Sequence, residues 1–155
     1  LMLRSLEEVG AWIPIEITKK VGNNVERTTG LLNGGFRTFR PTIALPYVLC
    51  RRFHIEGLYF IGNGRLMRTN EYVFVRIATE DRVTEWVRAE VLVFLEDRIL
   101  ISTALADEFG VGVYSLHRGI WFFQDEPNKL RKPVKPKLYR ISPRTTQTME
   151  NREIV

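Results

Sequence analysis

The chain has 155 residues, 45% of them apolar, and carries a formal net charge of +5. No apolar run approaches the roughly 18 residues of a membrane span. A single cysteine leaves no internal disulfide, and no charged and then apolar leader precedes Trp12. We therefore expect one soluble globular domain with an appendage, located in the cytoplasm and with no membrane as partner.

The first half of the chain predicts two hairpins and one short helix. Apolar residues alternate over residues 11–17, where Pro14 favours an edge position. The turn-forming residues 22–24 separate this strand from a returning strand over residues 25–32. The pattern then predicts a strand at residues 42–45, a helix at residues 47–53 that begins after Pro46, and a glycine hairpin over residues 58–68.

The second half predicts longer strands, a second short helix and a closing hairpin. A helix is expected over residues 104–109, because Ser102 or Thr103 can cap its start and Gly110 can take the left-handed conformation that ends it. The remaining patterns predict strands at residues 71–79, 85–95 and 99–101, and a hairpin over residues 111–123. About ten short strands with two short helices predict a mainly β fold, a closed or partly open antiparallel barrel.

A short apolar run that ends in an amide and two glycines stands out at residues 31–36, Leu-Leu-Asn-Gly-Gly-Phe. Adjacent glycines let the backbone take positive φ and leave room for another chain or a ligand to come close. The run therefore predicts a strand that leads into a tight loop. This loop is either an ordinary turn, which is the commoner case, or a place where something docks.

The order of these elements resembles the retropepsin-like aspartic protease fold, over residues 11–124. The resemblance is carried by the run at residues 31–36, the Ile-Ala-Leu-Pro strand at residues 43–46, the glycine hairpin, and the Ile-Leu-Ile-Ser run at residues 99–102 that enters the second helix. The chain looks most like small archaeal retropepsin-like domains, which have a similar apolar hairpin near the end. The resemblance implies an acid-protease-like barrel and a homodimer.

In that family the loop reads Asp-Thr/Ser-Gly, and its aspartate pairs with a second aspartate to activate water. Here the matching positions hold Asn33, Gly34 and Gly35, so only the last agrees. Two carboxylates that share a proton supply a general base and a general acid, whereas an amide takes no proton at neutral pH. The resemblance therefore implies the fold without catalysis. An engineered aspartate-to-asparagine change is the alternative, although it leaves Gly34 unexplained.

Other catalytic or cofactor sites have little support. Cys50 and His54 stand four residues apart on the first predicted helix, a spacing that could pair a thiolate with an imidazole. A core cysteine and a surface histidine are the commoner arrangement. With one cysteine and two histidines, no common structural zinc set can form in one chain. We expect no cofactor and no metal.

The C-terminal segment is basic and rich in proline. Residues 127–155 hold eight basic and two acidic residues, a net of +6, so the other residues hold 15 basic and 16 acidic residues, a net of −1. Four of the seven prolines fall in this segment and keep it extended. We therefore divide the chain into a β domain at residues 1–125 and a basic extension at residues 126–155.

Such an extension suits a track of RNA phosphates, as in the extensions of ribosomal proteins. Arginine can fork onto phosphates and tyrosine can stack on a base. The alternative is a tail that only aids solubility. The candidate RNA-binding residues are Lys129, Arg131, Lys132, Lys135, Lys137, Tyr139, Arg140 and Arg144.

Two functions of different class follow from these observations. The first is a non-catalytic RNA-binding protein, a component of an archaeal ribosome or similar ribonucleoprotein, with ribosomal RNA and neighbouring ribosomal proteins as partners. The second is a homodimeric aspartic-type peptidase, or a peptide-binding pseudo-protease derived from one. RNA binding with steep salt dependence would favour the first function. A symmetric dimer with the two Asn33 loops facing each other would favour the second.

Overall fold

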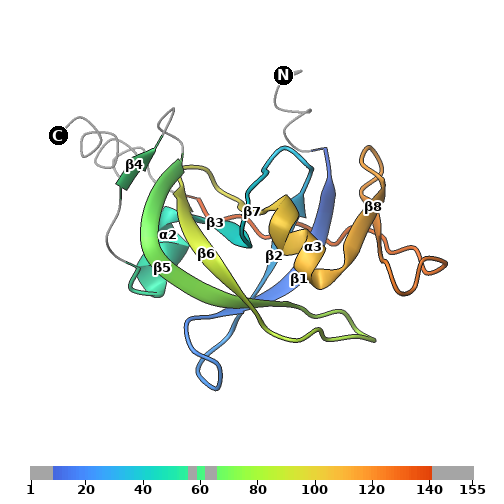
Figure 1. Ribbon diagram of the computed structural model, residues 1–155, viewed down its shortest axis with the longest axis horizontal. Helices are drawn as coiled ribbons and strands as arrows, with labels where there is room; N and C mark the ends of the chain where they lie inside the picture. The colour runs from blue at the N-terminus through green and yellow to red at the C-terminus, as the bar shows by residue number, and fades with distance from the viewer. Residues whose placement is uncertain (1–8, 56–58, 62–65, 141–155) are drawn as a thin grey trace.

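The computed structural model describes residues 9–55, 59–61 and 66–140 (Figure 1). The strands are β1 (Ala11–Thr18), β2 (Glu26–Leu32), β3 (Thr42–Pro46), β4 (Tyr59–Ile61), β5 (Leu66–Ile77), β6 (Val87–Phe94), β7 (Ile99–Ile101), β8 (Val111–Ser115) and β9 (Ile120–Phe123). The helices are α2 (Tyr47–Arg52) and α3 (Thr103–Phe109). The predicted mainly β fold with two short helices is confirmed. The turn of the glycine hairpin, at residues 62–64, lies outside the described residues.

Six strands close into a barrel in the order β1-β2-β7-β3-β6-β5, and β5 pairs back onto β1. Strand β4 adds to the outer edge of β5, and β8 pairs with β9 in a separate hairpin (Figure 1). The pairs β2–β7 and β3–β6 are parallel, so the barrel is mixed, whereas the sequence predicted antiparallel pairing. The reason is that β7 enters the sheet between β2 and β3, which no local hairpin connection dictates.

Strand β5 is one continuous strand, although the sequence predicted two segments separated by residues 69 and 70. A register shift between Arg68 and Tyr72 accommodates the break in the pattern. Within it, the buried Thr69 donates its hydroxyl to the Val91 carbonyl at 2.8 Å. The resulting strand is long enough to bend across the barrel and pair with β1, β4 and β6.

Apolar side chains from every barrel strand fill the interior. All five residues of β3 are buried, which fits a strand that is covered on both faces. Gly30 of β2 lies where a Cβ atom would approach Ile101 Cγ1 to 2.7 Å, so this pairing of β2 with β7 requires a glycine. The core therefore selects residue size as well as hydrophobicity.

Helix α3 starts and ends at the signals in the sequence. Of the two candidate caps, Ser102 is the one used: its Oγ accepts from Leu105 N at 3.0 Å. The same oxygen accepts from Thr42 N at 3.0 Å, which ties the helix to β3. Gly110 ends the helix at a φ of 68°. One buried hydroxyl thus fixes both a helix start and its position on the barrel.

Replacement Ser102→Ala should lower the free energy of unfolding by about 2 kcal/mol, because it removes the cap and leaves two buried N–H groups without their acceptor. Denaturant unfolding of both proteins measures this. Thr103→Ala at the neighbouring position is the matched control, since the Thr103 side chain makes no hydrogen bond in the described part of the chain. Equal losses for the two variants would contradict the role given to the Ser102 hydroxyl.

Candidate nucleic-acid interface

The basic segment lies against the body through backbone hydrogen bonds. Arg131 and Trp121 exchange two bonds, of 2.7 and 3.0 Å, as in a short antiparallel bridge. Further along, Val134 N donates to the Trp12 carbonyl at 3.1 Å and Tyr139 N donates to the Asp97 carbonyl at 2.6 Å. Residues 126–128 form a turn, in which Lys129 N donates to the Glu126 carbonyl at 3.0 Å, whereas the sequence predicted an extended chain there. Residues 129–140 contain no helix or turn, and these hydrogen bonds hold them in place.

Arg131 anchors the start of the segment. Its guanidinium binds both carboxylate oxygens of Asp81, at 2.8 and 3.1 Å, and lies 5.0 Å from the Phe123 ring centroid. Only 9% of the Arg131 side chain is exposed, so it packs against the β8–β9 hairpin and is largely shielded from solvent. Lys129 also pairs with Asp81. Hydrogen bonds from Arg131 and then Lys129 hold the pKa of Asp81 well below its usual range.

Tyr139 anchors the end of the described segment. It is 4% exposed and belongs to the same cluster of buried residues as the barrel core. Its hydroxyl makes hydrogen bonds of 2.7 Å to Thr28 Oγ1 and 2.9 Å to Glu26 Oε2. Burial raises the pKa of Tyr139. A side chain held in this way contacts protein on its ring face, since Arg52 lies 5.8 Å from the ring centroid.

Lys137 completes this anchor. Its Nζ lies 3.1 Å from Glu26 Oε2, and its backbone N–H donates to Thr29 Oγ1 at 2.8 Å. Burial would raise the pKa of Glu26, but the hydrogen bonds from Lys137 and Tyr139 outweigh it and leave this pKa below its usual value. Glu26 therefore stays ionised and binds two residues of the segment.

The other cations of the segment are exposed. Lys132, Lys135 and Arg140 make no ion pair with any residue that the structure describes, and all three side chains are accessible. Arg144, the last predicted residue of the set, lies outside the described residues. The seven candidate residues that the structure describes are therefore of two kinds: Lys129, Arg131, Lys137 and Tyr139 hold the segment, and Lys132, Lys135 and Arg140 are available to a partner.

The loop after β2 is a tight turn. Asn33 Oδ1 accepts from Gly35 N at 2.9 Å, and Gly34 has a φ of 80°, a conformation that favours glycine. Both glycines are exposed, and Asn33 is partly buried. The amide therefore serves as a brace for its own loop through an oxygen that a carboxylate would also supply. The side-chain amide of Asn33 cannot act as a general acid or a general base at neutral pH.

Cys50 and His54 do not form a catalytic pair. Cys50 is buried and directs its thiol toward the Leu45 carbonyl, with the sulfur 3.5 Å from that oxygen. Burial raises the pKa of Cys50 to about 12, so the thiolate is disfavoured at neutral pH. His54 is exposed, beyond the end of α2. Among the described residues, no group of three His, Cys, Asp or Glu side chains could hold a metal ion.

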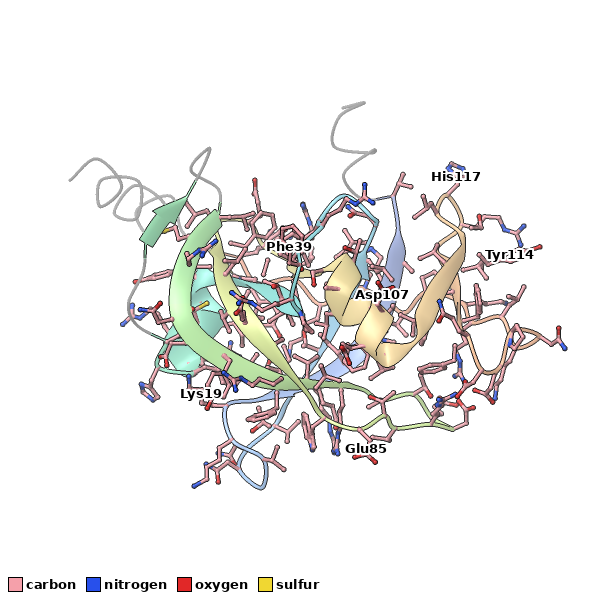
Figure 2. The ribbon with its side chains drawn as sticks, in the orientation of Figure 1. Lys19, Phe39, Glu85, Asp107, Tyr114 and His117 are labelled. Carbon is pink, nitrogen blue, oxygen red and sulfur yellow. The ribbon has the colours of Figure 1, made fainter. Side chains whose placement is uncertain are left out.

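Sequence reasoning missed a groove that three distant segments form. It lies between the loop at residues 37–42 and the outer faces of β5 and β6, and its volume is about 740 Å³. Phe39 projects from this loop, in the upper middle of Figure 2 between β6 and α3, and is fully exposed. The signal in the sequence was the Arg-Thr-Phe-Arg run at residues 37–40, an aromatic residue between arginines.

No protein-family model matches the chain, and a search of curated proteins finds no match. Among the described residues, no helix is long and apolar enough to cross a membrane. The fold and the contacts of individual side chains are therefore the basis for any functional argument.

Replacement Tyr139→Phe should lower the free energy of unfolding by about 1 to 2 kcal/mol, because it removes a hydroxyl that is hydrogen-bonded to Thr28 and Glu26 in a buried position. Denaturant unfolding measures the change. Tyr114→Phe is the matched control, since Tyr114 is 62% exposed and should tolerate the change within about 0.5 kcal/mol. An unchanged unfolding midpoint for Tyr139→Phe would show that the segment does not anchor here.

Proposed function

We propose that the chain is a non-catalytic RNA-binding protein with a retropepsin-like fold, which works as a component of an archaeal ribosome or similar ribonucleoprotein. The observation that carries RNA binding is the exposed row of Lys132, Lys135 and Arg140 on a segment whose neighbouring cations are used to hold it on the body. Cations on an anchored backbone are suited to phosphates, since the backbone that carries them is already held before binding.

The retropepsin-like assignment is supported by the six-strand mixed barrel and by its connections. Strand β2 delivers residues 33–35 to a tight turn, and β7 runs parallel to β2 before it enters α3. These are the elements that carried the resemblance in the sequence. The turn holds an asparagine and two glycines where a peptidase of this class would need an aspartate, so the fold is proposed here without the reaction.

A homodimeric peptide-binding relative of the peptidases is the second candidate. The observation that favours it is the exposure of Gly34 and Gly35 at the end of a barrel strand, where another copy of the loop could approach. Sedimentation of the purified chain tests this second candidate, because it requires a dimer. Substitutions in the Asn33 loop should then convert the dimer into monomers.

The purified chain should show no pepstatin-sensitive proteolysis at any pH between about 3 and 7, the range in which carboxylate dyads work. The replacement Asn33→Asp alone should not create activity, because Gly34 still stands at the hydroxyl position of the motif. Turnover of a broad peptide library measures both proteins. Cleavage by the unmodified chain would refute the non-catalytic assignment.

The RNA-binding proposal predicts a salt effect at three residues. Joint replacement of Lys132, Lys135 and Arg140 by Gln should weaken RNA binding and flatten the plot of log affinity against log salt by about 2, from roughly 0.7 per phosphate contact. Thermal stability should change little, because these side chains make no ion pair in the described structure. A salt titration of RNA binding measures the slope.

The matched control replaces Lys20, Arg51 and Arg118 by Gln, three exposed cations that also lack an ion pair among the described residues. We call this the surface control. It removes the same charge at sites scattered over the body, so it should change the slope much less. Equal slopes for the two triple variants would mean that the segment contributes only net charge, and the proposed role of the row would be wrong.

A further inference from the structure

The groove beside Phe39 has the charges of a phosphate-binding site. Arg37, Arg68 and Arg88 line it, and none of them forms an ion pair with a described residue. The two glutamates that line it are already paired: Glu90 lies 2.9 Å from Arg40 Nε and Glu71 lies 3.0 Å from Lys19 Nζ. Three arginines in the groove are therefore free to bind an anion.

The groove also has aromatic faces next to these arginines. Phe39 has a relative exposure of 105%, so its ring packs on nothing in the described structure. Tyr72 is 39% exposed, and the Arg88 guanidinium lies 4.0 Å from its ring centroid. A guanidinium over a tyrosine ring gives a flat surface on which a further planar group can stack.

Each feature alone has an ordinary explanation. A single exposed phenylalanine is common on protein surfaces, and so are arginines on the outer face of a sheet. Their combination in one hollow is more specific, because arginine and aromatic faces together match the phosphates and the bases of a nucleic acid. An acidic peptide would use the arginines and leave Phe39 exposed. A base would cover it.

We propose that this groove binds a single-stranded segment of RNA, with a base stacked on Phe39 and phosphates held by Arg37, Arg68 and Arg88. The strand is unpaired, because a base inside a duplex has no free face for the ring. The inference rests on the proposed RNA-binding function, yet it uses different residues from those of the basic segment. The groove supplies recognition of unpaired bases, which Lys132, Lys135 and Arg140 do not supply through phosphate contacts.

The test measures binding of the full-length chain to an oligouridylate of about 12 nucleotides, within the site size usual for single-strand grooves, and to a duplex RNA of equal length. Phe39→Ala should weaken binding to the oligouridylate by about ten-fold, the usual scale for one stacked base, and leave duplex binding unchanged. Phe39→Trp should retain the affinity and show quenching of the new indole when the oligouridylate binds.

Joint replacement of Arg37, Arg68 and Arg88 by Gln should flatten the salt dependence of oligouridylate binding by about 2. The surface control, with equal loss of charge, should bind the oligouridylate with a nearly unchanged slope. If Phe39→Ala binds as well as the unmodified chain, or loses duplex and single-strand binding equally, the groove does not stack bases and the inference is wrong. The inference also fails if polyglutamate displaces the oligouridylate at equal charge concentration.

These experiments test the groove and the basic segment independently. If the Lys132, Lys135 and Arg140 variant binds normally while the Phe39 and arginine variants do not, the segment is excluded and the groove stands. The reverse result excludes the groove and leaves the proposed function intact. If the unmodified chain binds no RNA, both are wrong. If Phe39→Ala instead turns a dimer into monomers without altering RNA binding, the groove is a contact between two copies, and the inference is overturned.

Discussion

Closure of the barrel at β1 is the constraint on which the rest of the structure depends. Strand β1 pairs with β2 from Ala11 to Ile17, but it pairs with β5 only from Ile15 to Thr18. The first half of β1 therefore has a free side, at which the carbonyls of Trp12 and Pro14 face away from β2. Ala78 N binds the Pro14 carbonyl and Val134 N binds the Trp12 carbonyl. The basic segment thus completes an edge that the barrel leaves open.

Pro14 explains why this edge is open where it is. Proline has no N–H group, so a sheet interior does not accept it without the loss of a hydrogen bond. In β1 it stands immediately before Ile15, where pairing with β5 begins. The sequence predicted an edge position for Pro14, whereas β1 has neighbours on both sides in the closed barrel. Pro14 nevertheless lies outside the stretch of β1 that pairs with β5, which covers Ile15 to Thr18. The position of Pro14 in β1 therefore marks where the basic segment can lie beside this strand.

Local chemistry was readable in the sequence, and long-range pairing was not. Alternation placed the strands, and Ser102 and Gly110 marked the ends of α3 because capping depends on residues that are neighbours in the chain. The position of β7 between β2 and β3 depends instead on how the barrel closes. The bond between Arg131 and Asp81 joins residues 50 positions apart, and no local pattern predicts it.

The same limit applies to the candidate site. Composition identified the basic segment and its eight candidate residues, but burial of Tyr139 could be found only from the structure, since the tyrosine stands in a basic stretch, two residues after Lys137 and next to Arg140. The groove beside Phe39 joins a loop to two strands that follow it by about 30 to 50 positions, so no single stretch of sequence contains it. Sequence reasoning found residue types, and the fold decided which of them meet.

The net charge of the basic segment overstates the number of cations that are free to bind a partner. The sequence gives the segment an excess of positive charge over a body that is nearly neutral. Yet Asp81 and Glu26, both on the body, take up Lys129, Arg131 and Lys137 as ion-pair partners. These pairs fix the backbone on which Lys132, Lys135 and Arg140 stand. An ion pair at a partly exposed surface adds little stability by itself. Here its consequence is positional, because a row of cations that is held in place loses less conformational entropy when it meets phosphates.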